Sequence, residues 1–62
     1  PKLTNKQRFA VELAIEKGYY EYPRKISVQE LAKISKSPRS TFQEHLRKAE
    51  SKLMKILLQS QN

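Results

Sequence analysis

The sequence predicts an all-α fold: a single three-helix helix-turn-helix domain, residues 1–62, with a long C-terminal helix. Two helix-start signals lie close together, Ser27 with Glu30 three residues later and Ser37 followed by Pro38, and one apolar stripe runs through both helices. The helix between the two starts has room for only about two turns. A short helix, a turn of about three residues and a longer helix form the helix-turn-helix arrangement.

The first helix is predicted over residues 5–17. Thr4 is its cap, Gln7 occupies the capping-box position, and Gly18 supplies the left-handed residue that ends the helix. Its apolar residues fall on two sides of the helix: a stripe of Phe9, Ala10, Leu13 and Ala14, and a patch of Val11 and Ile15. We expect the stripe to cover the helix-turn-helix unit and the patch to meet the far end of the last helix or a second subunit.

The connection over residues 18–25 holds three of the five aromatic residues, and Pro23 biases Tyr22 toward an extended conformation. We predict an ordered strap. Tyrosines beside basic residues can stack on the bases of single-stranded nucleic acid. The favoured interpretation is structural, with the rings packed on the core and the hydroxyls at the surface.

The second helix is predicted over residues 28–34, with a capping box that starts at Ser27. Arg24 and Lys25 come just before this start. They and the free N–H groups of the helix are therefore placed to hold a backbone phosphate. The residues expected to point inward are Val28, Leu31, Ala32 and Ile34.

The turn over residues 35–37 lacks the glycine that such turns favour. A left-handed Lys36 therefore carries ~1 kcal/mol of strain or more. The residues predicted to contact DNA phosphates lie before the second helix, in this turn and along the third helix: Arg24, Lys25, Ser27, Lys36, Ser37, Thr41 and Lys48.

The third helix is predicted to begin at Pro38 and to run for about 20 residues. No glycine or proline interrupts it before its end. Its apolar positions follow alternating steps of four and three residues: Phe42, Leu46, Ala49, Leu53 and Ile56 or Leu57. A break near Glu50-Ser51, which would produce a fourth helix, stays open.

Polar side chains occupy the side of the third helix opposite Phe42. Arginine, glutamine and glutamate can read guanine, adenine and cytosine edges, although the same residue types are common on ordinary wet helix faces. Position favours readout, because the second helix of such a unit meets the major groove with its N-terminal part. The residues predicted to read bases are Arg39, Ser40, Gln43, Glu44 and Arg47.

The chain is strongly basic, with 13 Lys and Arg against six Asp and Glu, a net charge of +7 and a pI of about 10.0. Residues 36–55 hold six of the basic residues and two of the acidic ones. This charge is typical of a polyanion binder, and a solvated face of a lysine-rich protein is the alternative.

The last two turns of the third helix are apolar on several sides, so something must cover them. We expect a homodimer, whose two-fold symmetry suits half-sites one helical turn apart. An amphipathic membrane contact is the rival interpretation. The residues predicted at the dimer interface are Val11, Ile15, Met54, Leu57 and Leu58.

Other classes of protein are disfavoured by composition. The chain has no cysteine, a lone His45 and six scattered carboxylates, which form no catalytic constellation and no metal site. We therefore expect no enzymatic activity, no cofactor and no small-molecule ligand in this domain. No apolar run approaches the ~20 residues that span a membrane, so a soluble, cytoplasmic protein is predicted.

The order and spacing of several motifs resemble a known family. The most specific of them are Leu3-Thr4 with Gln7, Gly18-Tyr19-Tyr20 followed by Pro23-Arg24, Glu30-Leu31-Ala32, Ser40-Thr41-Phe42 with Glu44-His45-Leu46-Arg47, and Ala49-Glu50. Over residues 3–58 the chain resembles the archaeal helix-turn-helix domain found at the carboxyl end of bacterio-opsin activator-type transcriptional regulators. Its departure is in the turn, where Lys36 and Ser37 replace the usual glycine and aliphatic residue.

This resemblance implies double-stranded DNA as the partner, and it implies the output module at the C-terminal part of a longer regulator. Two other classes stay open. A helical protein-interaction module of the transcription apparatus would carry an incidental basic face, and an RNA binder would prefer single strands or A-form helices. The affinity of a DNA binder should fall steeply with salt, whereas an apolar protein contact should respond less.

Overall fold

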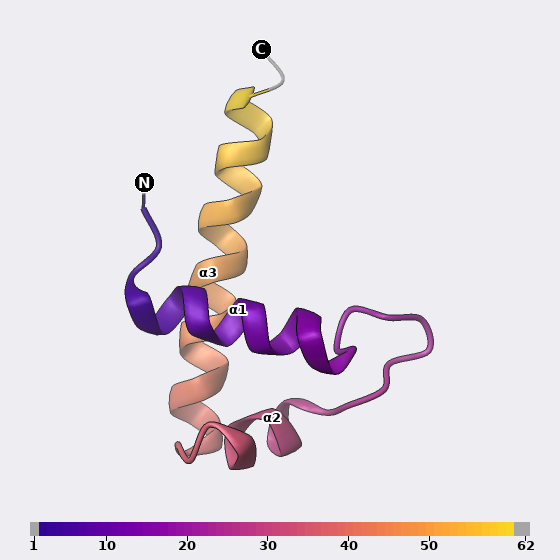
Figure 1. Ribbon diagram of the computed structural model, residues 1–62. Coiled ribbons are helices and arrows are strands. Elements are labelled where there is room, and N and C mark those ends of the chain that lie inside the picture. The colour runs from indigo at the N-terminus through magenta and orange to yellow at the C-terminus, as the bar shows by residue number, and fades with distance from the viewer. Residues whose placement is uncertain (1, 61–62) are drawn as a thin grey trace.

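The structure, a computed structural model, describes residues 2–60 and contains three helices: α1 (Asn5–Lys17), α2 (Val28–Ile34) and α3 (Arg39–Ser60). The helix α3 is a long rod that α1 crosses near its middle, while α2 lies beside its first turns (Figure 1). The described residues contain no strand. The predicted all-α helix-turn-helix fold is therefore confirmed.

Both ends of α1 form as the sequence predicts. The Thr4 hydroxyl accepts from the Gln7 N–H, and the Thr4 N–H donates to the Gln7 side-chain oxygen, each at 3.1 Å. Gly18 ends the helix with φ 89°. A Cβ at this position would also meet the Lys25 side chain at 2.9 Å, so glycine is required by both conformation and space.

The predicted capping box of α2 is also present, with the Ser27 hydroxyl accepting from the Glu30 N–H at 3.2 Å. The start of α3 differs by one residue from the prediction. Pro38 precedes the helix, and its carbonyl accepts the first helical hydrogen bond from Phe42 at 3.0 Å. The hydrogen bond of the Ser37 hydroxyl is with Ser35, 2.6 Å away, rather than with the first turn of α3.

Lys36 adopts the left-handed conformation in which the sequence analysis expects it to be strained, with φ 58°. We expect Lys36→Gly to raise the free energy of unfolding by about 0.5 to 1 kcal/mol, because relieving the left-handed strain outweighs the extra unfolded-state entropy of glycine. Urea unfolding at equal protein concentration measures this change. Lys33→Gly, inside α2, is the matched control and should instead lower stability by about 1 kcal/mol. A loss of stability in both variants would contradict the strain argument.

One core joins the three helices. Its buried residues come from all of them: Ala10, Val11, Leu13, Ala14, Leu31, Ala32, Phe42, Leu46 and Ala49. Two residues predicted to point inward do not, since Phe9 is 51% exposed and Ile34 is 47% exposed. Each lies roughly 90° or more around its helix from the centre of the buried side. A neighbouring helix that packs on the buried side does not extend far enough to cover these positions.

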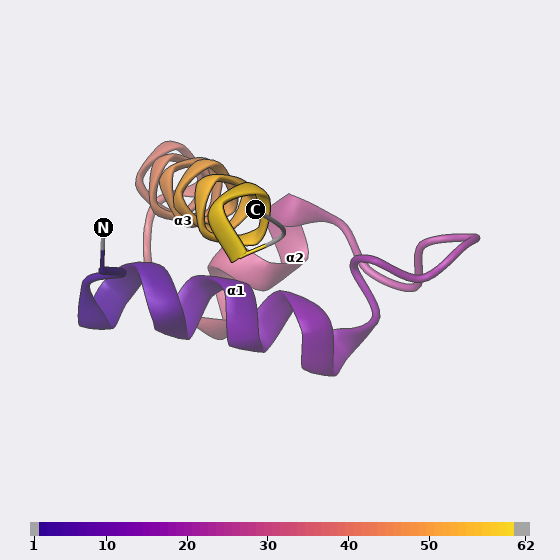
Figure 2. The ribbon, with the colours of Figure 1, turned by 90° about the horizontal axis from the view of Figure 1, so that it is seen from above.

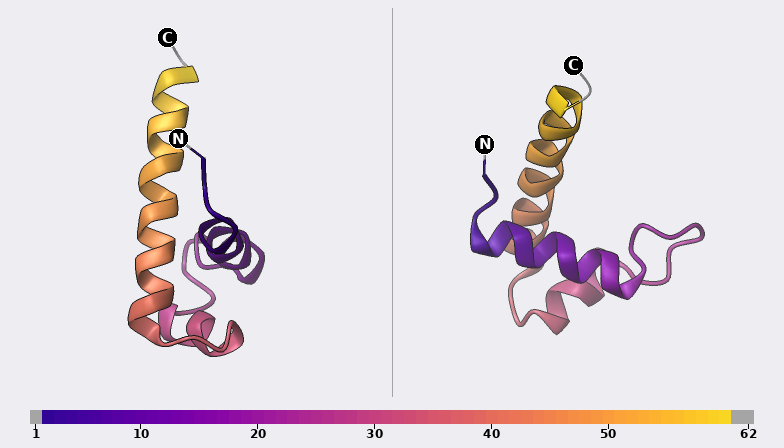
Figure 3. Two further views of the ribbon diagram at one scale, coloured as in Figure 1. Left: turned by 90° about the vertical axis from the view of Figure 1, so that its left-hand side faces the viewer. Right: turned by 45° about the horizontal axis from the view of Figure 1, so that its top comes forward.

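The helix α3 is continuous from Arg39 to Ser60, so the possible break near Glu50-Ser51 is not present. Its C-terminal part projects beyond α1, and no other helix of residues 2–60 lies beside it (Figures 1 and 3). The apolar side chains there are left exposed: Met54, Ile56, Leu57 and Leu58.

The strap of residues 18–25 extends to the side of the helices (Figure 2). It is held to α3 by the Tyr20 hydroxyl, which donates to the carboxylate of Glu50. Partial burial and this hydrogen bond raise the pKa of the Tyr20 phenol, so it remains a donor at neutral pH. The ring of Tyr19 is half-buried against the core, as predicted, whereas Tyr22 is fully exposed and does not pack on it.

Candidate nucleic-acid interface

The five residues predicted to read bases all lie exposed on the N-terminal half of α3. This face is opposite Phe42 and Leu46, which are buried against α1 and α2. The side chains of Gln43 and Arg47 are therefore available to a ligand. The helices α1 and α2 both lie on one side of α3, which leaves the opposite side of its first turns open (Figure 3).

A hollow of about 610 Å³ lies on one side of this face. The strap, the start of α2 and the start of α3 line it together. It brings the predicted phosphate contacts Arg24, Lys25 and Ser27 next to Arg39 and Gln43. Residues from three separate stretches of sequence thus meet beside the exposed face of α3.

Arg24 is held at this hollow by an aromatic ring. Its guanidinium carbon lies 4.2 Å from the centroid of Tyr19, a cation–π distance. Tyr19 in turn packs edge-on against Tyr20, with 5.0 Å between ring centroids. Tyr19 therefore positions a cation and Tyr20 packs against it, a role that the sequence alone did not reveal.

A second hollow, of about 370 Å³, lies on the other side of the same face. It contains three more of the predicted phosphate contacts, Lys36, Ser37 and Thr41, and also Lys6 from the first turn of α1. Lys6 was not among the predicted contacts, because nothing in the sequence places the first turn of α1 beside the turn before α3.

The two hollows lie on opposite sides of the exposed face of α3. Thr41 lines one hollow and Gln43 lines the other, and on the helical wheel they are about 160° apart, with Ser40, Glu44 and Arg47 between them.

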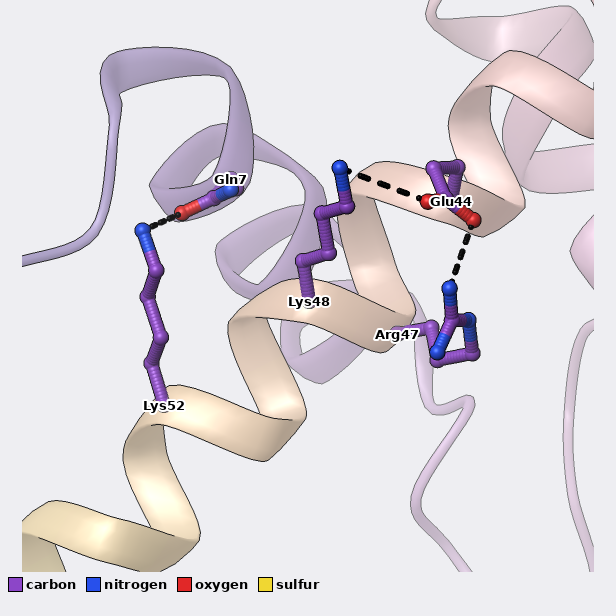
Figure 4. A network of polar contacts seen from close by, with 5 residues as sticks. All are labelled: Gln7, Glu44, Arg47, Lys48 and Lys52. Carbon is purple, nitrogen blue, oxygen red and sulfur yellow. Dashed lines mark hydrogen bonds and ion pairs between the residues drawn. The ribbon is translucent and has the colours of Figure 1, made fainter.

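Glu44 lies between two cations on this face (Figure 4). One carboxylate oxygen accepts from Arg47 Nη2 at 2.9 Å, and the other lies 3.4 Å from Lys48 Nζ. The hydrogen bonds from Arg47 and Lys48 lower the pKa of the Glu44 carboxyl, which stays ionised at neutral pH. The i,i+3 and i,i+4 spacing that brings these three side chains together is visible in the sequence.

Lys52 has a structural role that the sequence alone does not indicate. Its ammonium donates to the Gln7 side-chain oxygen at 2.9 Å (Figure 4). It also donates to the carbonyl of Lys2 at 3.0 Å. Gln7 is only 6% exposed, so this contact and the capping box satisfy the oxygen of a buried amide. Lys52 therefore ties the start of α1 to the middle of α3.

The residues predicted at a dimer interface lie in two places. Val11, Ile15 and Met54 line one hollow of about 570 Å³ between α1 and α3, whereas Leu57 and Leu58 lie farther along α3. Val11 is only 8% exposed and packs mainly within the chain. The other four are exposed.

Residues 2–60 contain no group of three or more His, Cys, Asp or Glu side chains placed to hold a metal ion. His45 is half-buried beside Phe42 and Thr41, at the edge of the apolar stripe as predicted. Within the same described range, no helix is long and apolar enough to cross a membrane.

A short helix, a tight turn and a longer helix with an exposed polar N-terminal half define the helix-turn-helix class. The chain belongs to the family of helix-turn-helix DNA-binding domains, of the bacterio-opsin activator type, which matches residues 3–55. The predicted family is thereby confirmed. It is a family of DNA-binding domains of transcriptional regulators and not an enzyme family.

Two relatives come from the archaeon Haloferax volcanii. The chain is 46% identical over 57 residues to the transcriptional regulator NarO, covering 92% of this chain and 27% of that protein. It is 38% identical over 61 residues to a putative transcriptional regulator, covering 98% of this chain and 10% of that protein. No solved structure matches the chain. The chain thus spans about a quarter or less of the relatives it matches.

Proposed function

We propose that this chain binds double-stranded DNA in a sequence-specific manner, with the N-terminal half of α3 in the major groove. The observation that carries the proposal is the exposed polar face of α3 between two hollows that each include basic residues, Arg24, Lys25 and Arg39 in one and Lys6 and Lys36 in the other. A groove presents base edges between two phosphate backbones, so a base-reading face needs cations on both sides. The family and the net charge of +7 support the same function.

The side chains have separate roles in this complex. Arg39, Gln43 and Arg47 carry the donors and acceptors that guanine and adenine edges recognise. Arg24 and Lys25 contact one backbone and Lys36 contacts the other, which fixes the position of α3 without specifying sequence. Because these contacts displace condensed counterions, affinity falls steeply as salt rises.

We further propose that the chain, residues 1–62, is one domain and the output module of a longer transcriptional regulator. The support for this proposal comes from the two relatives. Both are named as transcriptional regulators, and the chain covers 27% of the length of one and 10% of the other. The stimulus would then act through parts of the protein outside these residues.

Selection of bound duplexes from a random pool, at two salt concentrations, tests the proposed function. We expect a defined recognition sequence at both salts and a steep decline of affinity with salt. Single-stranded RNA and a matched A-form duplex serve as competitors. Enrichment of no sequence, or better competition by RNA than by B-form DNA, would contradict the proposal.

We propose a second copy of this chain as the partner of the exposed apolar end of α3. Two-fold pairing there places two recognition helices on one duplex, at half-sites about one helical turn apart. Ile15 and Met54 line a hollow next to the projecting helix end, so α1 also contributes surface to such a contact.

Leu57→Glu combined with Leu58→Glu is expected to give a monomer, because two carboxylates in an apolar contact lose their hydration without a partner. Sedimentation equilibrium measures the mass. Gln59→Glu with Ser60→Glu adds the same charge at neighbouring polar positions and should remain dimeric. An unchanged mass in the leucine variant, or a monomeric wild-type chain, would remove the dimer from the proposal.

A further inference from the structure

We propose that Glu44 is a positioning residue that sets the discrimination between specific and non-specific duplex DNA, by holding Arg47 for base readout and by competing with phosphates for Lys48. This inference rests on the proposed function. It assigns Glu44 a role other than the direct cytosine contact that its residue type predicts.

The geometry of the pair carries the first half of this role. Arg47 Nη2 donates to Glu44 at 2.9 Å across one turn of α3, which fixes the direction of an otherwise exposed guanidinium. Arginine has five N–H donors, so one bond to Glu44 leaves four for a base. Because Arg47 is already oriented, it loses less side-chain conformational entropy on binding a guanine than a mobile arginine would lose.

The second half of the role comes from Lys48, whose ammonium lies 3.4 Å from the other carboxylate oxygen. A phosphate must displace Glu44 from Lys48, and it must approach the negative charge of Glu44 itself. Non-specific complexes depend almost entirely on phosphate contacts, so this cost falls mainly on them. In the specific complex, the base contacts of Arg47 offset the cost of displacing Glu44 from Lys48.

Among residues 2–60, the side chain of Glu44 contacts no charged group other than Arg47 and Lys48. Its two oxygens are engaged by Arg47 and Lys48, and all three side chains are exposed. Exposed pairs of this kind contribute little to folding. The arrangement is therefore better suited to tuning a ligand contact than to stabilising the domain.

Glu44→Gln tests the proposal, with affinity measured for the selected duplex and for a scrambled duplex across a salt series. We expect non-specific affinity to rise about twofold to fivefold, the magnitude associated with exposed ion pairs. Specific affinity should rise less or fall, so the ratio of the two decreases. The slope of log affinity against log salt should steepen by about 0.9 for the phosphate that Lys48 now neutralises.

Glu12→Gln is the matched control, because it removes the same charge from α1 beside Leu53 and Ile56, away from the first turns of α3. An equal rise of both affinities in Glu44→Gln, as in the control, would overturn the proposal. Loss of discrimination at one cytosine only would also overturn it, since Glu44 would then read that base. A wild-type chain that prefers no duplex would instead refute the proposed function, which is a separate outcome.

Thermal unfolding checks that Glu44→Gln folds like the wild type. We expect the same midpoint, within error, because the three side chains are exposed. A large fall in the midpoint would show that Glu44 supports the fold, and it would overturn the assignment of a role in binding.

Discussion

Replacing Phe42 by alanine is expected to lower the free energy of unfolding by about 3 to 5 kcal/mol, the cost of removing a buried aromatic ring from a packed core. Phe42 is 2% exposed and is the first residue of α3 to enter the core. A domain of 62 residues has little stability to lose, so the variant should be largely unfolded at room temperature. Urea unfolding followed by far-ultraviolet circular dichroism measures the change.

Phe9→Ala is the matched control for this loss. Phe9 is half exposed at the edge of the hollow beside the turn, so the same truncation removes less buried surface. We expect a cost of about 1 kcal/mol or less for Phe9. Equal costs at the two positions would contradict the placement of α3 on α1 and α2.

Arg47→Ala and, separately, Gln43→Ala are expected to weaken binding to the selected duplex by about 1 to 3 kcal/mol each. The loss should fall on one base position, because each side chain can read one base edge. Titration of duplexes that differ at single positions measures it. Arg47 also donates to one oxygen of Glu44, so the Arg47→Ala variant leaves Lys48 as the remaining cation beside that carboxylate.

Arg8→Ala controls for the loss of one positive charge, because Arg8 is exposed on α1 next to Leu53 and Ile56. We expect a small and sequence-independent loss for this variant. If Arg47→Ala weakened all sequences equally, Arg47 would contact only phosphate. The same pattern for Gln43 would remove base readout from this face altogether.

The sequence predicted the parts of the fold whose causes are local. The caps at Thr4 and Ser27 and the glycine stop at Gly18 all depend on residues within one turn of each other, so they could be found by spacing. The predicted bounds of α1 and α2 match the structure, and the start of α3 is shifted by one residue.

Features that join distant residues could not be predicted in the same way. Tyr20 bonds to Glu50, and Lys52 bonds to Gln7, across 30 and 45 residues respectively. The exposure of Phe9 likewise depends on how far α3 extends over α1, which a helical wheel does not contain. The wheel gives the side of a helix on which a residue lies, and the neighbouring helix decides whether that side is covered.

For the candidate site, the sequence predicted which residues are exposed on α3 but not how they are grouped. The exposed face follows from the helical period alone. The two flanking hollows do not, since they require the strap and the first turn of α1 to fold back beside α3. The base contacts and the dimer remain predictions.

Replacement of single atoms in the selected duplex tests the placement of α3 in the major groove most directly. Exchanging a recognised guanine for 7-deazaguanine removes only the N7 acceptor in the major groove, whereas inosine removes only the amino group in the minor groove. We predict that 7-deazaguanine weakens binding about fivefold or more, whereas inosine changes affinity by less than about twofold. Loss of affinity with inosine and none with 7-deazaguanine would contradict the proposal that α3 reads the major groove.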